Sequence, residues 1–117
     1  GELADAEAQL RWVLDNSKSD IFQDTARLRL ARVLIAMEDL DGTEVLLQQP
    51  ASDSAFDPLY TEVRGDMNIA RGDIAAAHTA YQEALAATAA GAPGRHMLEL
   101  KYQGTQGAAV VPGAPQE

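Results

Sequence analysis

Between residues 59 and 88, apolar side chains recur at steps of three and four, which is the spacing of an amphipathic helix. The first stripe comprises Leu59 or Tyr60, Val63, Met67 and Ala70, and the second comprises Ile74, Ala77, Tyr81, Ala84, Leu85 and Thr88. Between the stripes, Gly72 can adopt the left-handed conformation that ends one helix, and Asp73 can cap the next. The pattern therefore predicts two antiparallel helices joined by a tight turn.

An earlier segment of the chain has the same organisation. A helix is expected from about Asp24 to Met37, followed by a turn at Glu38 and Asp39 and a second helix that ends before Pro50. Residues 3–14 predict one more helix upstream, and residues 93–102 predict a closing helix that tolerates a proline in its first turn.

The two hairpins are related by an offset of 34 residues. The offset aligns the small residues Ala31 and Gly65, and it also pairs identical residues: Phe22 with Phe56, Ile35 with Ile69, Ala36 with Ala70, and Asp39 with Asp73. A helix–turn–helix unit of this period is typical of the tetratricopeptide repeat. We therefore expect an all-α fold in which tetratricopeptide repeat-like hairpins stack as a short right-handed solenoid over residues 1–102, truncated at its N-terminus. Residues 103–117, rich in Gly, Ala, Pro and Gln, are expected to form a flexible tail.

Small residues in the later hairpin indicate close packing. An interior glycine costs a helix about 1 kcal/mol relative to alanine, so Gly65 requires a packing reason. We expect Gly65 and Ala77 to let the two helices approach, and Tyr81 to fill the space between one repeat and the next.

The overall charge narrows the class of partner. Nine Lys and Arg stand against eighteen Asp and Glu, giving a formal net charge of -9, which argues against a surface for nucleic acid or anionic lipid. Polypeptides are the more plausible partners. No apolar run reaches the ~20 residues of a membrane span, and nothing resembles a signal peptide.

No catalytic constellation is recognisable, and no cofactor is expected. The serines lie in expected turns without the glycine-flanked arrangement of a nucleophile. His96 and Glu99 could share a helix face as metal ligands, but two ligands do not make a site. Enzyme activity is therefore not expected, although a metal protein using His96 is kept as a rival hypothesis.

A binding surface is the better candidate for function. In repeat superhelices the first helix of each hairpin lines the concave side, where apolar anchors can bind a polypeptide while charges set its register. The repeat frame predicts a protein-binding groove lined by Leu28, Arg32, Ile35, Glu62, Asp66, Ile69, His96 and Leu100. The competing interpretation is that a terminal helix or tail of the chain fills this groove.

Several stretches carry a more specific resemblance: EVRGDMNIARGDIAAAHTAYQEAL, together with LRWVLDN, RLRLARVLIAMEDLD and HMLELK. With them the chain resembles the YfgM family, the ancillary subunit of the SecYEG translocon. The resemblance implies a bacterial inner-membrane protein whose N-terminal membrane helix, absent from this sequence, anchors a periplasmic repeat domain. It also implies two protein partners, the Sec translocon and a periplasmic chaperone of the peptidyl-prolyl isomerase type. The alternative is a generic soluble tetratricopeptide scaffold that assembles another complex.

Overall fold

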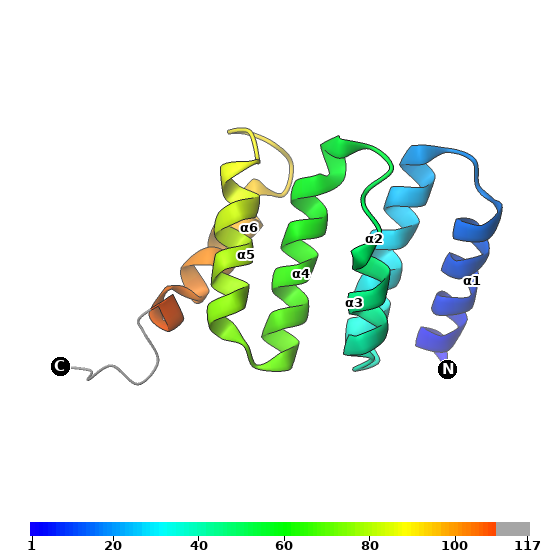
Figure 1. Cartoon of the computed structure of the whole chain (residues 1–117), viewed down its shortest axis with the longest axis horizontal. Coiled ribbons are helices and arrows are strands. Elements are labelled where there is room, and N and C mark those ends of the chain that lie inside the picture. The colour runs from blue at the N-terminus through cyan, green and yellow to red at the C-terminus, as the bar shows by residue number, and fades with distance from the viewer. Residues whose placement is uncertain (110–117) are drawn as a thin grey trace.

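The computed structural model describes residues 1–109, and its regular structure in this range is entirely helical. The α-helices are α1 (Glu2–Asn16), α2 (Asp20–Ala36), α3 (Leu40–Gln48), α4 (Asp57–Arg71), α5 (Ile74–Ala86) and α6 (Arg95–Gly104); the short 3₁₀ helices are η1 (Ser54–Phe56) and η2 (Gln106–Ala109). The helices stand side by side and follow one another along the long axis of the molecule (Figure 1). The expected all-α hairpin fold is confirmed.

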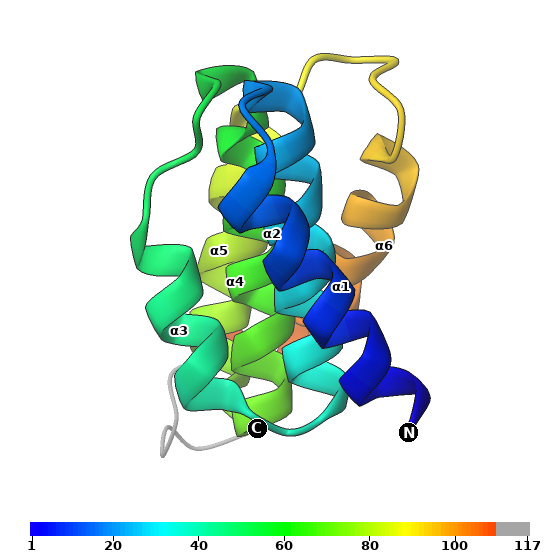
Figure 2. The ribbon, with the colours of Figure 1, turned by 90° about the vertical axis from the view of Figure 1, so that its right-hand side faces the viewer.

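The helices alternate between two roles. α2 pairs with α3, and α4 pairs with α5, as the two hairpins of the stack. We call α2, α4 and α6 the first helices and α1, α3 and α5 the second helices. Figure 2 looks along the stack from the α1 end, with α3 and α6 on opposite sides of the molecule. α1 is thus a second helix, and α6 a first helix, without the other half of a hairpin among the described residues.

Both hairpins turn through the same local geometry. Gly72 has a φ of 82°, and the Asp73 carboxylate caps α5 by accepting a hydrogen bond from the Ala76 N–H. In the earlier hairpin Glu38 occupies the left-handed region with a φ of 62°, and Asp39 caps α3. The backbone therefore makes the same turn at Glu38 without the glycine that this conformation favours.

Two apolar clusters of buried residues form the core, one at the α3–α4 junction and one at the α5–α6 junction. Leu28, Ala31, Leu47, Tyr60 and Val63 form the first cluster, and Ala77, Tyr81, Ala84 and Leu98 form the second. In both, a second helix packs against the first helix that follows it. Ala77 and Ala84 are fully buried, so the alanines of α5 are contact surface, as expected.

The N-terminal boundary of α2 differs from the prediction. The helix begins at Asp20, four residues before Asp24, because Ser19 caps it by accepting a hydrogen bond from the Phe22 N–H. Asp24 therefore lies inside the helix, where its side chain is fully buried.

The prediction of a flexible tail is wrong for residues 103–109. α6 continues to Gly104, and η2 packs against α5. Thr105 is buried and its hydroxyl lies 2.9 Å from Nδ1 of His78, whose ring stacks on Tyr102 with the centroids 4.6 Å apart. These contacts attach the end of α6 to α5. The remaining part of the expected tail, 110–117, lies outside the described residues.

Candidate functional site

The predicted groove lies on the side of the stack formed by the first helices, which we call the first-helix face. α2 packs against α4, and α6 reaches α4 through the side chain of Lys101. Arg32 and Ile69 are exposed on this face, and Ile35 is half-buried against the first core cluster. Ile69, with 41% of its surface exposed, is the accessible apolar side chain among the predicted α4 residues.

An ionic cluster connects α4, α5 and α6 at this face. The Lys101 ammonium donates to Glu62 at 2.7 Å and to Asp66 at 3.1 Å. The Tyr81 hydroxyl donates to Oδ1 of Asp66 at 2.6 Å. One lysine and one phenol therefore hold two carboxylates of α4 in place.

The electrostatics of the cluster keep Tyr81 neutral. Burial of the phenol is the largest cause of its raised pKa, followed by the hydrogen bond to Asp66 and the negative charges of Asp66 and Glu62. Arg32 acts in the opposite direction and lowers the pKa of Tyr81, which places its positive charge in the same neighbourhood. The hydroxyl is thus a stable donor at every physiological pH.

Two residues of the predicted groove are not open surface. Leu28 is 8% exposed and belongs to the first core cluster, because α2 turns this position toward α3 and α4. Glu62 is also buried, and its carboxylate is paired with Lys101. Leu28 therefore contributes to folding, and Glu62 contributes to a contact within the chain.

The predicted α6 residues, His96 and Leu100, do not occupy the positions expected of them. The reason is that the offset between equivalent residues increases from 34 to 35 before α6. Leu47 and Tyr81 are equivalent at the offset of 34, whereas Val63 and Leu98, which bury against them, are separated by 35. The connection from α5 to α6 thus holds one extra residue. With this shift Lys101, rather than Leu100, is the equivalent of Asp66.

The shift moves two predicted residues away from the ionic cluster. The side chain of His96 is 85% exposed and Leu100 is 48% exposed. Under the corrected frame Leu100 is equivalent to Gly65, so it points toward the place that a following second helix would take. Sequence reasoning missed Lys101, although alignment of α6 on its buried Leu98 would have found it.

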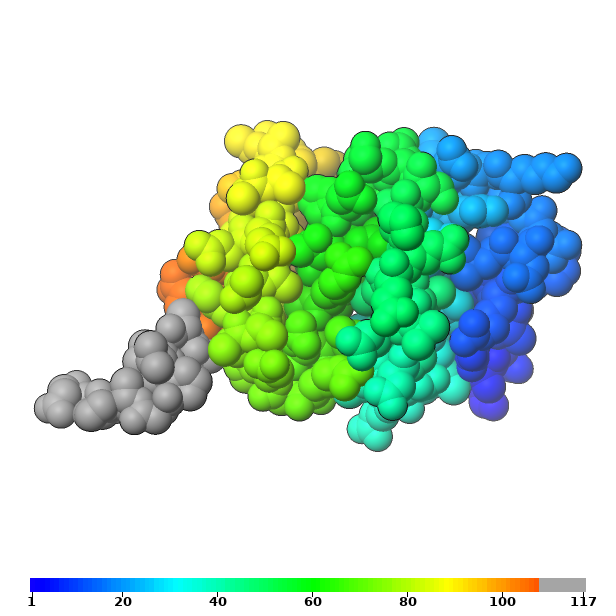
Figure 3. Space-filling model, viewed as in Figure 1, coloured from blue at the N-terminus to red at the C-terminus, as the bar shows by residue number. Residues whose placement is uncertain are grey.

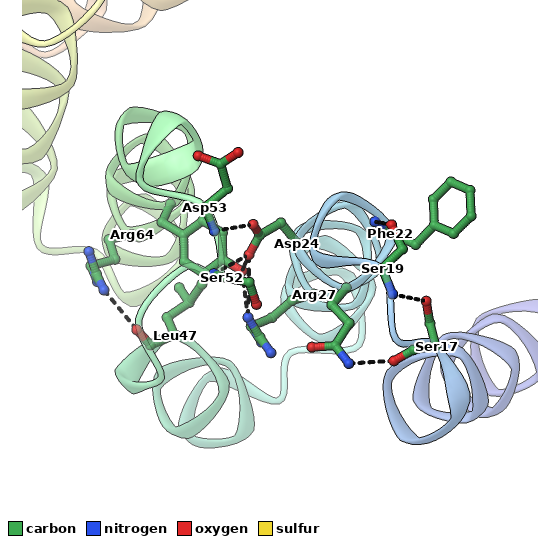
Figure 4. A network of polar contacts seen from close by, with 11 residues as sticks. Ser17, Ser19, Phe22, Asp24, Arg27, Leu47, Ser52, Asp53 and Arg64 are labelled. Carbon is green, nitrogen blue, oxygen red and sulfur yellow. Dashed lines mark hydrogen bonds and ion pairs between the residues drawn. The ribbon is translucent and has the colours of Figure 1, made fainter.

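A second polar network, also missed, lies inside the stack (Figure 4). The Asp24 carboxylate accepts hydrogen bonds from the backbone N–H groups of Ser52 and Asp53, each at 2.8 Å, and from the Tyr60 hydroxyl at 2.8 Å. Arg27 donates to the same hydroxyl at 2.8 Å and lies 3.5 Å from Asp24. Burial, then the hydrogen bond to Asp24, raises the pKa of Tyr60 to about 12. This network fixes the α3–α4 connection onto α2.

Three hollows of the surface lie away from the first-helix face. They have volumes of about 200, 340 and 270 Å³ and lie, respectively, between α3 and α4, between the start of α4 and the α5–α6 connection, and between α1 and α2. Figure 3 shows the other side of the molecule, over α3, α4 and α5, with α6 largely behind α5. None of these three hollows is lined by a predicted groove residue.

The rival metal hypothesis depends on His96 and Glu99. Nδ1 of His96 lies 3.9 Å from Oε1 of Glu99 on an exposed helix face. Across residues 1–109, no group of three or more His, Cys, Asp or Glu side chains is arranged to hold a metal ion. The same stretch contains no helix with the length and apolar character needed to cross a membrane.

Comparison with known proteins agrees with the fold. The family model described as "Tetratricopeptide repeat-like domain" matches residues 1–106. The chain belongs to this tetratricopeptide repeat-like family.

Within this family, the sequence resemblance noted above is confirmed. The chain is 33% identical over 96 residues to the ancillary SecYEG translocon subunit of Neisseria gonorrhoeae (strain ATCC 700825 / FA 1090). The match covers 82% of this chain and 46% of the relative, so the tetratricopeptide repeat-like domain described here spans about half the length of that protein. No solved structure matches the chain.

Proposed function

We propose that this chain is a non-catalytic protein–protein interaction module, the periplasmic domain of a membrane-anchored ancillary subunit of the Sec translocon. In this role it docks a periplasmic peptidyl-prolyl isomerase-type chaperone or a translocating polypeptide. The translocon role extends to this chain what the name of its relative says. The membrane anchor, the periplasmic location and the chaperone are what the sequence resemblance implies. Tetratricopeptide repeat-like folds serve many partners. The binding surface must therefore be identified from the residues of this chain.

The observation that carries the proposal is the exposed Ile69 beside the ionic cluster on the first-helix face. Its surface is 41% exposed although it lies in the middle of the stack, one helical turn from Asp66. An exposed apolar side chain beside fixed charges offers an anchor and a register for a bound polypeptide.

Lys101 marks the edge of this surface on the side of α6. Its ammonium bridges from α6 to the two carboxylates of α4, so α6 forms one wall of the face without covering Ile69. The competing interpretation, in which a terminal segment fills the groove, fits Glu62, which Lys101 covers. The exposure of Ile69 within residues 1–109 supports an open surface at that position.

A matched pair of substitutions tests the proposal. Ile69→Asp on the first-helix face and Val45→Asp on α3 both change an exposed apolar residue to a charge, and Val45 is 67% exposed. Binding of purified translocon and of the purified chaperone is measured by pull-down with the full-length protein. The proposal expects loss of capture for Ile69→Asp alone. Equal capture by both variants contradicts this surface, and no capture by the unaltered protein contradicts the function.

A further inference from the structure

Arg32 differs from the other charged residues around Ile69, because they are engaged within the chain and Arg32 is not. Glu62 and Asp66 both accept hydrogen bonds from Lys101, and Asp66 also accepts one from the Tyr81 hydroxyl. Arg32 is exposed, and within residues 1–109 its guanidinium makes no hydrogen bond or ion pair. The negative charges of this face are therefore occupied, whereas the positive charge of Arg32 is available.

An arginine without a partner is the exception in this chain. Acidic residues outnumber basic ones by eighteen to nine, so carboxylates are plentiful. Arg29 is likewise unpaired within residues 1–109, but it lines the hollow between α1 and α2 and belongs to a different surface. The other arginines all donate to a carboxylate, a phenol or a carbonyl group of the chain: Arg11, Arg27, Arg64, Arg71 and Arg95.

The charge of Arg32 belongs to the face that carries the ionic cluster. Arg32 on α2 and Asp66 on α4 are equivalent at the offset of 34, and the two helices pack against each other. Burial raises the pKa of the Tyr81 phenol, whereas the charge of Arg32 lowers that pKa. Because the Tyr81 hydroxyl lies on Asp66, the guanidinium of Arg32 is directed to the α4 side of α2.

An apolar residue follows each of these two charges by about one helical turn. Ile35 comes three residues after Arg32, and Ile69 comes three residues after Asp66, so each isoleucine shares a helix face with its charge. Ile69 is exposed and Ile35 is half-buried. The face thus offers an available positive charge beside two isoleucines at equivalent positions.

We propose that the segment bound beside Ile69 is acidic: a side-chain carboxylate of the partner pairs with Arg32 while a neighbouring apolar side chain packs on Ile69 and Ile35. A guanidinium binds a carboxylate through two parallel hydrogen bonds, so it fixes orientation as well as charge. This inference rests on the proposed function, because it names the chemistry of the segment that the proposed surface binds.

The local charges and the net charge of the chain predict opposite partners. The net charge of -9 would by itself favour a basic segment. On this face, however, Lys101 and Tyr81 already hold the carboxylates of Glu62 and Asp66, so a basic segment gains little there. Contacts at short range decide which segment binds, because salt screens the more distant charges.

Peptide display tests the charge preference without the translocon or the chaperone. A library of random short peptides is selected against the unaltered chain and its variants, and the unaltered chain should enrich Asp and Glu next to an apolar residue several-fold. Arg32→Gln should lose this enrichment, and Arg32→Glu should select Lys and Arg instead, because it reverses the charge. Lys18→Glu makes the same change of charge at an exposed residue of the α1–α2 connection, and it should select the same peptides as the unaltered chain.

The variants should keep the helical circular dichroism of the unaltered chain, because Arg32 and Lys18 are exposed. The proposal is overturned by a lack of acidic enrichment with the unaltered chain, by undiminished acidic enrichment with Arg32→Gln, or by an equal loss with Lys18→Glu. The pull-down separates this inference from the proposed function. Capture that is lost in Ile69→Asp and retained in Arg32→Gln overturns the acidic segment alone, whereas no capture by the unaltered protein overturns the function.

Discussion

Gly65 of α4 lies directly against the ring of Tyr81 on α5. A Cβ atom at residue 65 would lie 2.7 Å from Cδ1 and 2.9 Å from Cζ of the tyrosine, closer than real Cβ contacts allow. The absence of a side chain at Gly65 therefore lets the tyrosine ring pack between the helices and place its hydroxyl on Asp66. The alanines of α5 and this glycine serve the same purpose, which is close approach.

Enlarging residue 65 should destabilise the fold. Gly65→Leu forces the Tyr81 ring out of its position, and overpacking of this kind costs roughly 1 to 3 kcal/mol of unfolding free energy. Gly104→Ala is the control, because a Cβ there meets nothing within 4 Å. Urea unfolding followed by circular dichroism measures both. Equal stability of Gly65→Leu and the unaltered chain would show that the packing is loose.

Replacing the left-handed residue of the α2–α3 turn with glycine should stabilise the fold. Glu38 has a φ of 62°, a conformation that costs a non-glycine residue about 1 to 2 kcal/mol, so Glu38→Gly should raise the unfolding free energy by about 1 kcal/mol. Gly72→Ala, at the equivalent turn with a φ of 82°, should lower it by a similar amount. Opposite shifts in the urea midpoint check the pair, and shifts of the same sign would contradict the geometry.

Removing the Asp24 carboxylate from the buried network should cost more stability than removing the Tyr60 hydroxyl. Asp24→Ala leaves the buried Arg27 without its carboxylate partner and two backbone N–H groups unsatisfied, which should cost about 3 to 5 kcal/mol. Tyr60→Phe keeps the shape of the ring and removes one hydroxyl, so it should cost about 1 to 3 kcal/mol. A smaller effect for Asp24→Ala than for Tyr60→Phe, measured in the same unfolding assay, would remove Asp24 from the centre of the network.

Alkaline pH should weaken the fold through the buried phenol of Tyr60. The pKa of Tyr60 is raised from 10.0 in a free chain to about 12, so the folded state favours the neutral phenol. Its contribution is complete below pH 10 and is lost as the pH rises from 10 toward about 12, because the unfolded chain ionises first. Urea unfolding between pH 8 and 11 should show this loss, and Tyr60→Phe should make the decline shallower. An unchanged slope in that variant would assign the alkaline sensitivity to other groups.

Much of the fold was predictable because the hydrophobic pattern fixes the helices and the offset of 34 relates one hairpin to the next. The turn at Gly72 and the close contact at Gly65 were predictable because glycine is the residue that suits a left-handed turn or a close approach of two helices. The ionic cluster was not predictable in full, because one extra residue in the α5–α6 connection shifts the frame from Leu100 to Lys101. The network of Asp24 and Arg27 was missed because charged residues in a helix usually face water, and nothing local signals that Tyr60 and a loop backbone complete their bonds.

The shifted frame of α6 can itself be checked. Lys101→Met removes the bridge to Glu62 and Asp66, so amide hydrogen exchange in α6 should accelerate several-fold as the helix separates from α4 more often. His96→Met changes a side chain that is 85% exposed, and it should leave the exchange of α6 unchanged. Faster exchange in the His96 variant alone would restore the unshifted frame.

Site-specific photo-crosslinking in the full-length protein tests the central claim most directly. A photoreactive residue at Ile69 reports on the first-helix face, and the same residue at Val45 reports on α3. The account predicts adducts with a translocon subunit or the periplasmic chaperone from position 69 and none from position 45. Adducts from position 45 alone, or adducts from neither position while the complex still assembles, would contradict it.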